Sequence, residues 1–93
     1  MKTTTITIKG EAHTRNVWLN GKELSPIKSQ KVWNHSPDGF NWGYGGSGPA
    51  QLALAICLEV FPEDIAIRKY QDFKWNVIAK LPGDEDFEIT ITL

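Results

Sequence analysis

The sequence predicts an α+β fold in which one mostly antiparallel sheet of about four strands carries two helices on one face. Three observations lead to this prediction. Both ends of the chain alternate apolar and polar residues, an Asn-Gly pair follows the first alternating stretch, and two apolar helical stretches lie in the second half. We expect residues 1–93 to form a single compact domain, because this length is enough for one modest core.

The terminal strands are predicted from a period of two. Between Thr3 and Lys9, Ile6 and Ile8 share one face and threonines occupy the other. The stretch from Phe87 to Leu93 repeats this alternation. β-Branched residues at this period are typical of strands with one buried face. Because both stretches are rich in threonine on the face that would meet water, we expect the first and last strands to pair.

A hairpin is predicted between these two strands. Asn20-Gly21 accepts the positive φ angles of a type I′ turn, so short strands should flank it within residues 17–24. Ser25-Pro26 then interrupts the ladder. Residues 25–34 fit either a short strand or a turn of helix, and the sequence leaves both open.

The first predicted helix spans Ala50 to Val60, which holds no glycine or proline. Pro49 suits its first position, Ser47 or Gly48 can serve as N-cap, and Gln51 can reach back to the cap backbone. Apolar side chains cover nearly its whole circumference, which predicts the central helix of the core.

The second predicted helix begins near Pro62 and runs to about Lys80. Its apolar face recurs at helical spacing, and its charged residues, Lys74 among them, mostly take the other face. Pro82-Gly83 ends it, although Trp75 to Ile78 is less favourable to a helix, so the helix could end earlier.

The loop before the central helix combines glycines with aromatic residues. Its rings alternate with other residues, which would place all three on one side of an extended segment. Its glycines are typical of positive φ angles or of a close approach by another backbone or a ligand. The rings are Phe40, Trp42 and Tyr44, and the glycines are Gly43, Gly45, Gly46 and Gly48.

The run F-N-W-G-Y-G-G-S-G-P-A-Q-L-A-L-A, preceded by N-H-S-P-D-G, resembles the signature of an uncharacterised family of small bacterial and mobile-element proteins. The resemblance covers roughly a quarter of the chain closely, and extends more loosely to the hairpin and the second helix. A domain of unknown function of this kind has no established activity. The resemblance therefore implies no catalytic residues, and implies only that the junction of loop and helix is the family's hallmark.

Composition excludes several classes of function. A net charge of −1 gives no general attraction to nucleic acid or to an anionic membrane. The central helix is too short for a membrane span, which needs about 20 apolar residues. The N-terminus has no apolar signal region, and the lone Cys57, expected to be buried, cannot form an internal disulfide. We therefore expect a cytoplasmic protein that binds neither nucleic acid nor membrane.

The sequence also argues against catalytic chemistry. His13, His35 and Cys57 lack metal-ligand spacing, so we expect no metal and no cofactor. Ser36 or Ser47 could act as a nucleophile with His35 as base and Asp38 as its orienting partner, but adjacency in sequence does not establish triad geometry.

A phosphate site is a sharper alternative. Gly43, Gly45 and Gly48 fall on the offsets of the G-x-G-x-x-G pattern at the start of a helix, yet no βαβ unit surrounds them. The simpler interpretation is that the glycines let the loop fold tightly over the sheet.

We predict a non-catalytic binding domain that acts through this loop, with a protein as its partner. The candidate residues are His35, Phe40, Trp42, Tyr44, Gly45, Gly46, Ser47 and Gly48. A protein partner predicts that Trp42 or Tyr44 is exposed beside a contiguous apolar patch. The first alternative is a small anionic ligand or nucleotide bound by N–H groups at the helix N-terminus, and the second is a hydrolase-like enzyme that uses His35 and a loop serine. The sequence does not set the oligomeric state.

Overall fold

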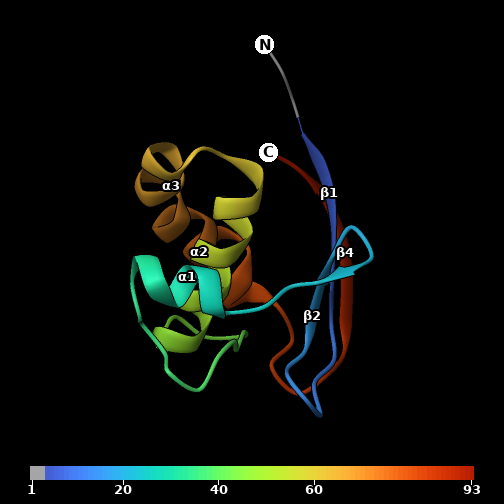
Figure 1. Ribbon diagram of the computed structural model, residues 1–93. Coiled ribbons are helices and arrows are strands. Elements are labelled where there is room, and N and C mark those ends of the chain that lie inside the picture. The colour runs from blue at the N-terminus through green and yellow to red at the C-terminus, as the bar shows by residue number, and fades with distance from the viewer. Residues whose placement is uncertain (1–3) are drawn as a thin grey trace.

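The structure of the protein is a computed structural model that describes residues 4–93. It is an α+β fold in which one sheet faces a layer of helices (Figure 1). Thr3, where the first strand was predicted to begin, lies outside the described residues. The elements in chain order are β1 (Thr5–Gly10), β2 (Val17–Leu19), β3 (Lys22–Glu23), α1 (Ile27–Val32), α2 (Ser47–Val60), α3 (Glu63–Asn76), the 3₁₀ helix η1 (Ile78–Lys80) and β4 (Phe87–Thr92).

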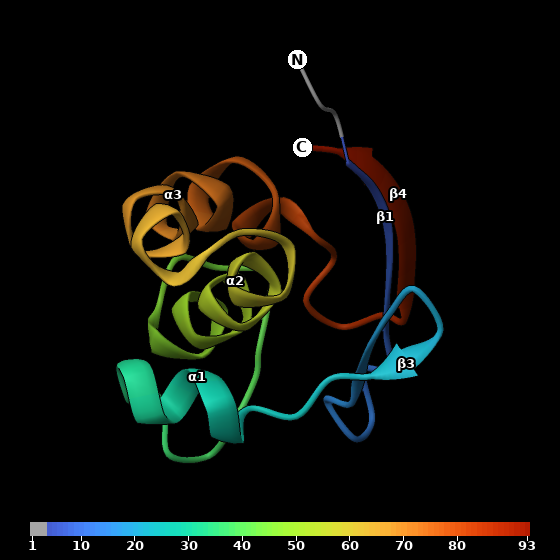
Figure 2. The same cartoon turned by 45° about the horizontal axis from the view of Figure 1, so that its top comes forward.

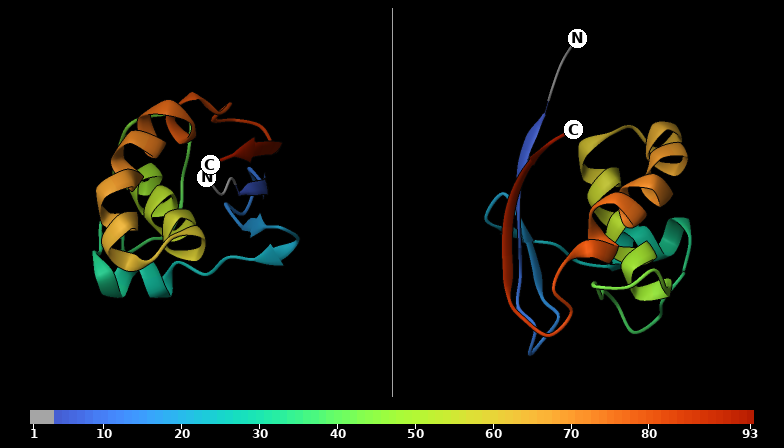
Figure 3. Two further views of the ribbon diagram at one scale, coloured as in Figure 1. Left: turned by 90° about the horizontal axis from the view of Figure 1, so that it is seen from above. Right: turned by 180° about the vertical axis from the view of Figure 1, so that it is seen from behind.

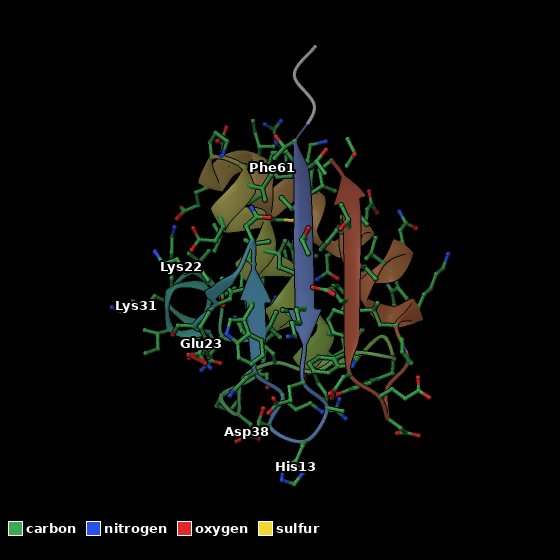
Figure 4. All side chains as sticks on the ribbon, turned by 90° about the vertical axis from the view of Figure 1, so that its right-hand side faces the viewer. His13, Lys22, Glu23, Lys31, Asp38 and Phe61 are labelled. Atoms are coloured by element: carbon green, nitrogen blue, oxygen red, sulfur yellow. The ribbon has the colours of Figure 1, made fainter. Side chains whose placement is uncertain are left out.

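The sheet is antiparallel with the strand order β3-β2-β1-β4, so the first and last long strands pair, as predicted. On its outer face the threonine hydroxyls of β1 and β4 meet in cross-strand pairs, Thr5 with Thr92 at 3.2 Å and Thr7 with Thr90 at 3.0 Å. The predicted Asn-Gly turn is confirmed, because φ is 53° at Asn20 and 81° at Gly21. Figure 4 looks onto this outer face, with the helices behind it.

All helices lie on the other face of the sheet (Figure 3). α2 packs against both α1 and α3 (Figure 2), and eleven of its residues are buried, which confirms its central position. It begins at Ser47 with Gly46 as N-cap, one or two residues before the predicted cap. Pro49 is tolerated there because it still lies in the first turn, where backbone N–H groups have no acceptor within the helix.

Two other helix predictions need correction. The chain has three α-helices within residues 4–93 rather than two, since residues 27–32 form α1, whose Ser29 hydroxyl donates to the Pro26 carbonyl at 2.8 Å. The second predicted helix ends at Asn76, before Lys80 and within the stretch from Trp75 to Ile78 where the sequence left an earlier end open. Val77 leaves helical geometry, with φ −125° and ψ −62°, and the chain continues as η1. β-Branched Val77 and Ile78 favour this break, because their side chains crowd the preceding helical turn.

The core lies between the sheet and α2. Ile6, Ile8 and Val17 of the sheet, together with Leu52 and Ile56 of α2, are at most 1% exposed. Within residues 4–93 no helix combines the length and the apolar character that crossing a membrane requires.

Candidate functional site

Gln51, a fully buried residue of α2, fixes the start of the loop that follows α1. Its Oε1 accepts the backbone N–H groups of His35 at 2.7 Å and Ser36 at 2.9 Å. Its Nε2 donates to the Ser29 hydroxyl at 2.9 Å and to the Trp33 carbonyl at 3.1 Å. The predicted reach of this side chain to the helix cap is therefore wrong, because all of its polar atoms are engaged by α1 and the loop.

His35 connects this loop to α3. Its Nε2 lies 2.9 Å from the Tyr70 hydroxyl, and its ring stacks on Trp33 with the centroids 5.4 Å apart and the planes 3° apart. Burial, and secondarily the charge of Lys74, lowers the pKa of His35. The folded protein therefore favours the neutral imidazole. No hydrogen bond in the described part of the chain joins this ring to the hydroxyl of Ser36, which is buried, or of Ser47, which is exposed.

The three loop rings do not share one environment. Phe40 and Trp42 are buried in the core, whereas Tyr44 is 48% exposed. The Trp42 indole N–H donates to the Pro82 carbonyl at 3.1 Å, and its ring packs edge-on against Phe87 with centroids 4.9 Å apart. The loop is thus anchored by two rings and presents the third to solvent.

Two of the loop glycines lie directly beneath aromatic rings. A Cβ atom on Gly45 would stand 2.2 Å from the Trp75 ring, and one on Gly46 would stand 2.4 Å from the Tyr44 ring. No other residue could occupy these positions without displacing the rings. Gly45 and Gly46 therefore allow the side chains of Trp75 and Tyr44 to lie flat on the backbone.

Lys74 lies between the Gly45 backbone and the Trp75 ring. The prediction that it sits on the solvated face of its helix is wrong. The residue is only 7% exposed. Its Nζ donates to the Gly45 carbonyl at 3.3 Å and lies 4.2 Å from the centroid of the Trp75 ring. The single ion pair within residues 4–93 joins Arg68 to Asp64, so the Lys74 ammonium has no carboxylate partner there.

These contacts connect the rings at the two ends of the loop through buried Tyr70 and Lys74 of α3. We define the aromatic surface as Trp33, His35, Tyr44 and Trp75, which come from the loop and from α3. Trp33 is 59% exposed and Trp75 56% exposed. His35 connects Trp33 to Tyr70, Tyr70 lies one helical turn from Lys74, and Lys74 joins Trp75 to the loop.

Sequence reasoning identified only part of this surface. It selected His35 and Tyr44 but missed Trp33, Trp75 and Lys74. The unusual count of four tryptophans was the available signal. It does not show which of them are buried, because only the fold decides that.

The comparison with protein families gives one finding. The model of a family described as "Family of unknown function (DUF6166)" matches residues 6–92. The chain belongs to the DUF6166 family. The match runs from β1 into β4 and includes the whole aromatic surface, so the DUF6166 unit holds both the sheet and the candidate site. Searches of curated proteins and of solved structures gave no match.

In this DUF6166 domain the loop covers part of the first turn of α2, where Gly48 is buried and Ser47 is exposed. Gly48 is buried, with the Asn41 side chain against it, and Tyr44 leans over Gly46. Groups of three or more His, Cys, Asp or Glu side chains that could hold a metal ion are absent from residues 4–93. An apolar pocket of about 270 Å³ between α2, α3 and Leu93 includes Cys57, whose pKa is raised by burial to about 12. The domain therefore offers a surface of exposed rings rather than a polar cleft at this loop.

Proposed function

We propose that this domain is a binding module that docks a protein partner on the aromatic surface. The observation that carries the proposal is the exposure of about half of each of three aromatic side chains, Trp33, Tyr44 and Trp75, around one loop. Tryptophan and tyrosine dominate the binding energy of protein interfaces, and contiguous apolar patches on a small domain mark interaction sites.

The way in which the rings are held supports this function. Trp75 lies on Gly45, Tyr44 lies on Gly46 and Trp33 stacks on His35, so each ring has a rigid support. Ordering a mobile side chain at an interface costs about 0.5–1.5 kcal/mol, and a surface that is already ordered avoids much of this cost. Gly45 and Gly46, which the sequence named both as candidate binding residues and as residues that let the loop fold tightly, thus shape the proposed binding surface through the rings that lie against them.

The alternatives receive less support. Tyr44 lies against Gly46 and Asn41 against Gly48, which leaves less room for an anion or nucleotide at the first turn of α2. A hydrolase would need a serine hydroxyl beside His35, and the partner of that ring is the Tyr70 hydroxyl.

A single cysteine supports a reducing compartment such as the cytoplasm, and the loop motif supports a bacterial or mobile-element origin.

The experiment is quantitative affinity capture with matched tryptophan variants. The wild type, the double variant Trp33→Ala/Trp75→Ala and the control Trp18→Ala would each be used as bait in lysate from the source cells. Trp18 is a good control because it lies on β2 at the outer face of the sheet, opposite Lys9, away from the helices. Circular dichroism would first establish that all three baits are folded.

We expect at least one protein to be captured equally by the wild type and by Trp18→Ala, and to be depleted at least tenfold with the double variant. A tenfold loss corresponds to about 1.4 kcal/mol, which is at the low end for two hot-spot tryptophans. Equal capture by all three baits would contradict the proposal.

A further inference from the structure

We infer that the partner presents a carboxylate, the side chain of an Asp or Glu, to the ammonium of Lys74 between the rings of the aromatic surface. This inference rests on the proposed function and names the chemistry of the partner. It starts from the burial of Lys74, which is 93% removed from solvent and forms no ion pair with any carboxylate of residues 4–93.

A buried lysine without a carboxylate is unusual. Lysine is among the side chains least often fully buried unless paired, because the ammonium loses its hydration. An ammonium has three donors, and the contacts found for this one are a carbonyl at 3.3 Å and the face of the Trp75 ring. Within residues 4–93 this ammonium is therefore held by a carbonyl and a ring face and by no carboxylate.

The surroundings of Lys74 have the electrostatics of a carboxylate receptor. The residues that touch it or lie beside it, Gly45, Tyr70, Trp75 and His35, carry no negative charge, and the presence of its charge disfavours protonation of His35. Lys74 also lies near the start of α2, where the helix dipole adds partial positive charge. The Trp75 ring would shield from water an acidic side chain that arrived here.

Charge complementarity thus selects an acidic residue over a basic or neutral one. Apolar neighbours of that residue would cover the three rings, so the predicted epitope is a carboxylate flanked by apolar side chains. Such an arrangement matches the general anatomy of interfaces, in which a desolvated charge pair sits among aromatic anchors.

The test uses two synthetic probe peptides, acetyl-Leu-Glu-Leu-amide and acetyl-Leu-Gln-Leu-amide, which differ only in the charge of the central side chain. Each would be titrated into ¹⁵N-labelled wild type, Lys74→Met and Lys69→Met, and the amide shifts of Gly45 and Gly46 and the indole shift of Trp75 would be followed. Met keeps the length of the lysine stem. Lys69 is a matched control, because it is an exposed lysine of the same helix that lies over the Phe61 ring.

We expect saturable shifts with the Glu peptide and an affinity for the Gln peptide that is weaker by about tenfold, as expected for the loss of one charge-assisted hydrogen bond. Lys74→Met should remove this preference and Lys69→Met should keep it. Equal affinity for the two peptides, or the absence of shifts at Gly45, Gly46 and Trp75, would overturn the inference.

The wild-type comparison decides the question even if Lys74→Met does not fold. Free acetate, titrated in parallel, separates a bare anion site from a peptide site, because acetate that binds as well as the Glu peptide would also overturn the inference. Failure of the inferred contact between a carboxylate and Lys74 is distinguishable from failure of the proposed function. Equal binding of both peptides that is lost in Trp33→Ala/Trp75→Ala would leave the aromatic surface as a binding site without a role for Lys74.

Discussion

Replacement of Gln51 by leucine should loosen the attachment of the loop to α2. Leucine has a similar size but accepts and donates no hydrogen bonds, so four contacts disappear together. The Ser36 N–H is the most affected group, because Ser36 is buried and no other acceptor for its N–H is found within residues 4–93. The His35 N–H keeps the Trp33 carbonyl at 3.1 Å, and the Ser29 hydroxyl keeps the Pro26 carbonyl at 2.8 Å.

The expected loss of stability follows from the difference between the Ser36 N–H, which loses its acceptor, and the His35 N–H and Ser29 hydroxyl, which each keep one. One buried N–H left unsatisfied costs about 1–3 kcal/mol, and each bond whose partners are otherwise satisfied contributes about 0.5–1.5 kcal/mol. Because the added apolar surface of leucine offsets part of the sum, we expect the free energy of unfolding to fall by about 3 kcal/mol. For a domain of this size, such a loss lowers the melting temperature by about 15 °C.

Urea unfolding followed by tryptophan fluorescence measures this loss directly, with Gln71→Leu as the control on the exposed face of α3. The control should stay within about 0.5 kcal/mol of the wild type. A loss below about 1 kcal/mol for Gln51→Leu would refute the reasoning, since it would show that water or relaxed backbone satisfies the released groups.

Three further predictions concern single groups of the domain. The lowered pKa of His35 means that the unfolded chain binds more protons below about pH 6.5, so stability should fall as pH falls from 6.5 through the folded-state pKa. Urea titrations at several pH values should show a smaller fall for His35→Asn, and identical slopes would count against the lowered pKa. Cys57, with its pKa raised to about 12, should not react with a thiol reagent at pH 8 until the protein unfolds, so rapid labelling of the native state would contradict its burial. Gly45→Ala should displace the Trp75 ring and shift its fluorescence emission, because the new methyl would stand 2.2 Å from that ring; an unchanged spectrum would exclude this contact.

Much of the sheet and the central helix could be predicted, because their signals are local. The alternation in β1 and β4, the turn at Asn20-Gly21 and the apolar circumference of α2 each arise within a few neighbouring residues. α1 was left open because its six residues are too few to show a helical period. The end of α3 was left open between Trp75 and Lys80 for a related reason, since one non-helical residue changes an apolar pattern little.

The candidate site was harder to predict than the fold. Glycine-rich backbone has no period, so alternation could not show that Trp42 points into the core and Tyr44 points out. Trp33 and Trp75 are distant in sequence, and Trp75 lies against Gly45, near the other end of the loop from Trp33, only through the packing of α3 on α2. Lys74 has the sequence context of a solvated lysine, and its contact with the Gly45 carbonyl, 29 residues away along the chain, is made only by the fold.

The most direct test of the central claim uses the four indole N–H signals of the domain, one for each tryptophan. A protein captured by the wild-type bait would be titrated into ¹⁵N-labelled domain, and the four signals would be followed. We predict that those of Trp33 and Trp75 shift, whereas that of Trp18 on the outer face of the sheet and that of buried Trp42, bonded to the Pro82 carbonyl, stay in place. A shift of Trp18 with Trp33 and Trp75 unchanged would place the binding surface on the sheet and contradict the account.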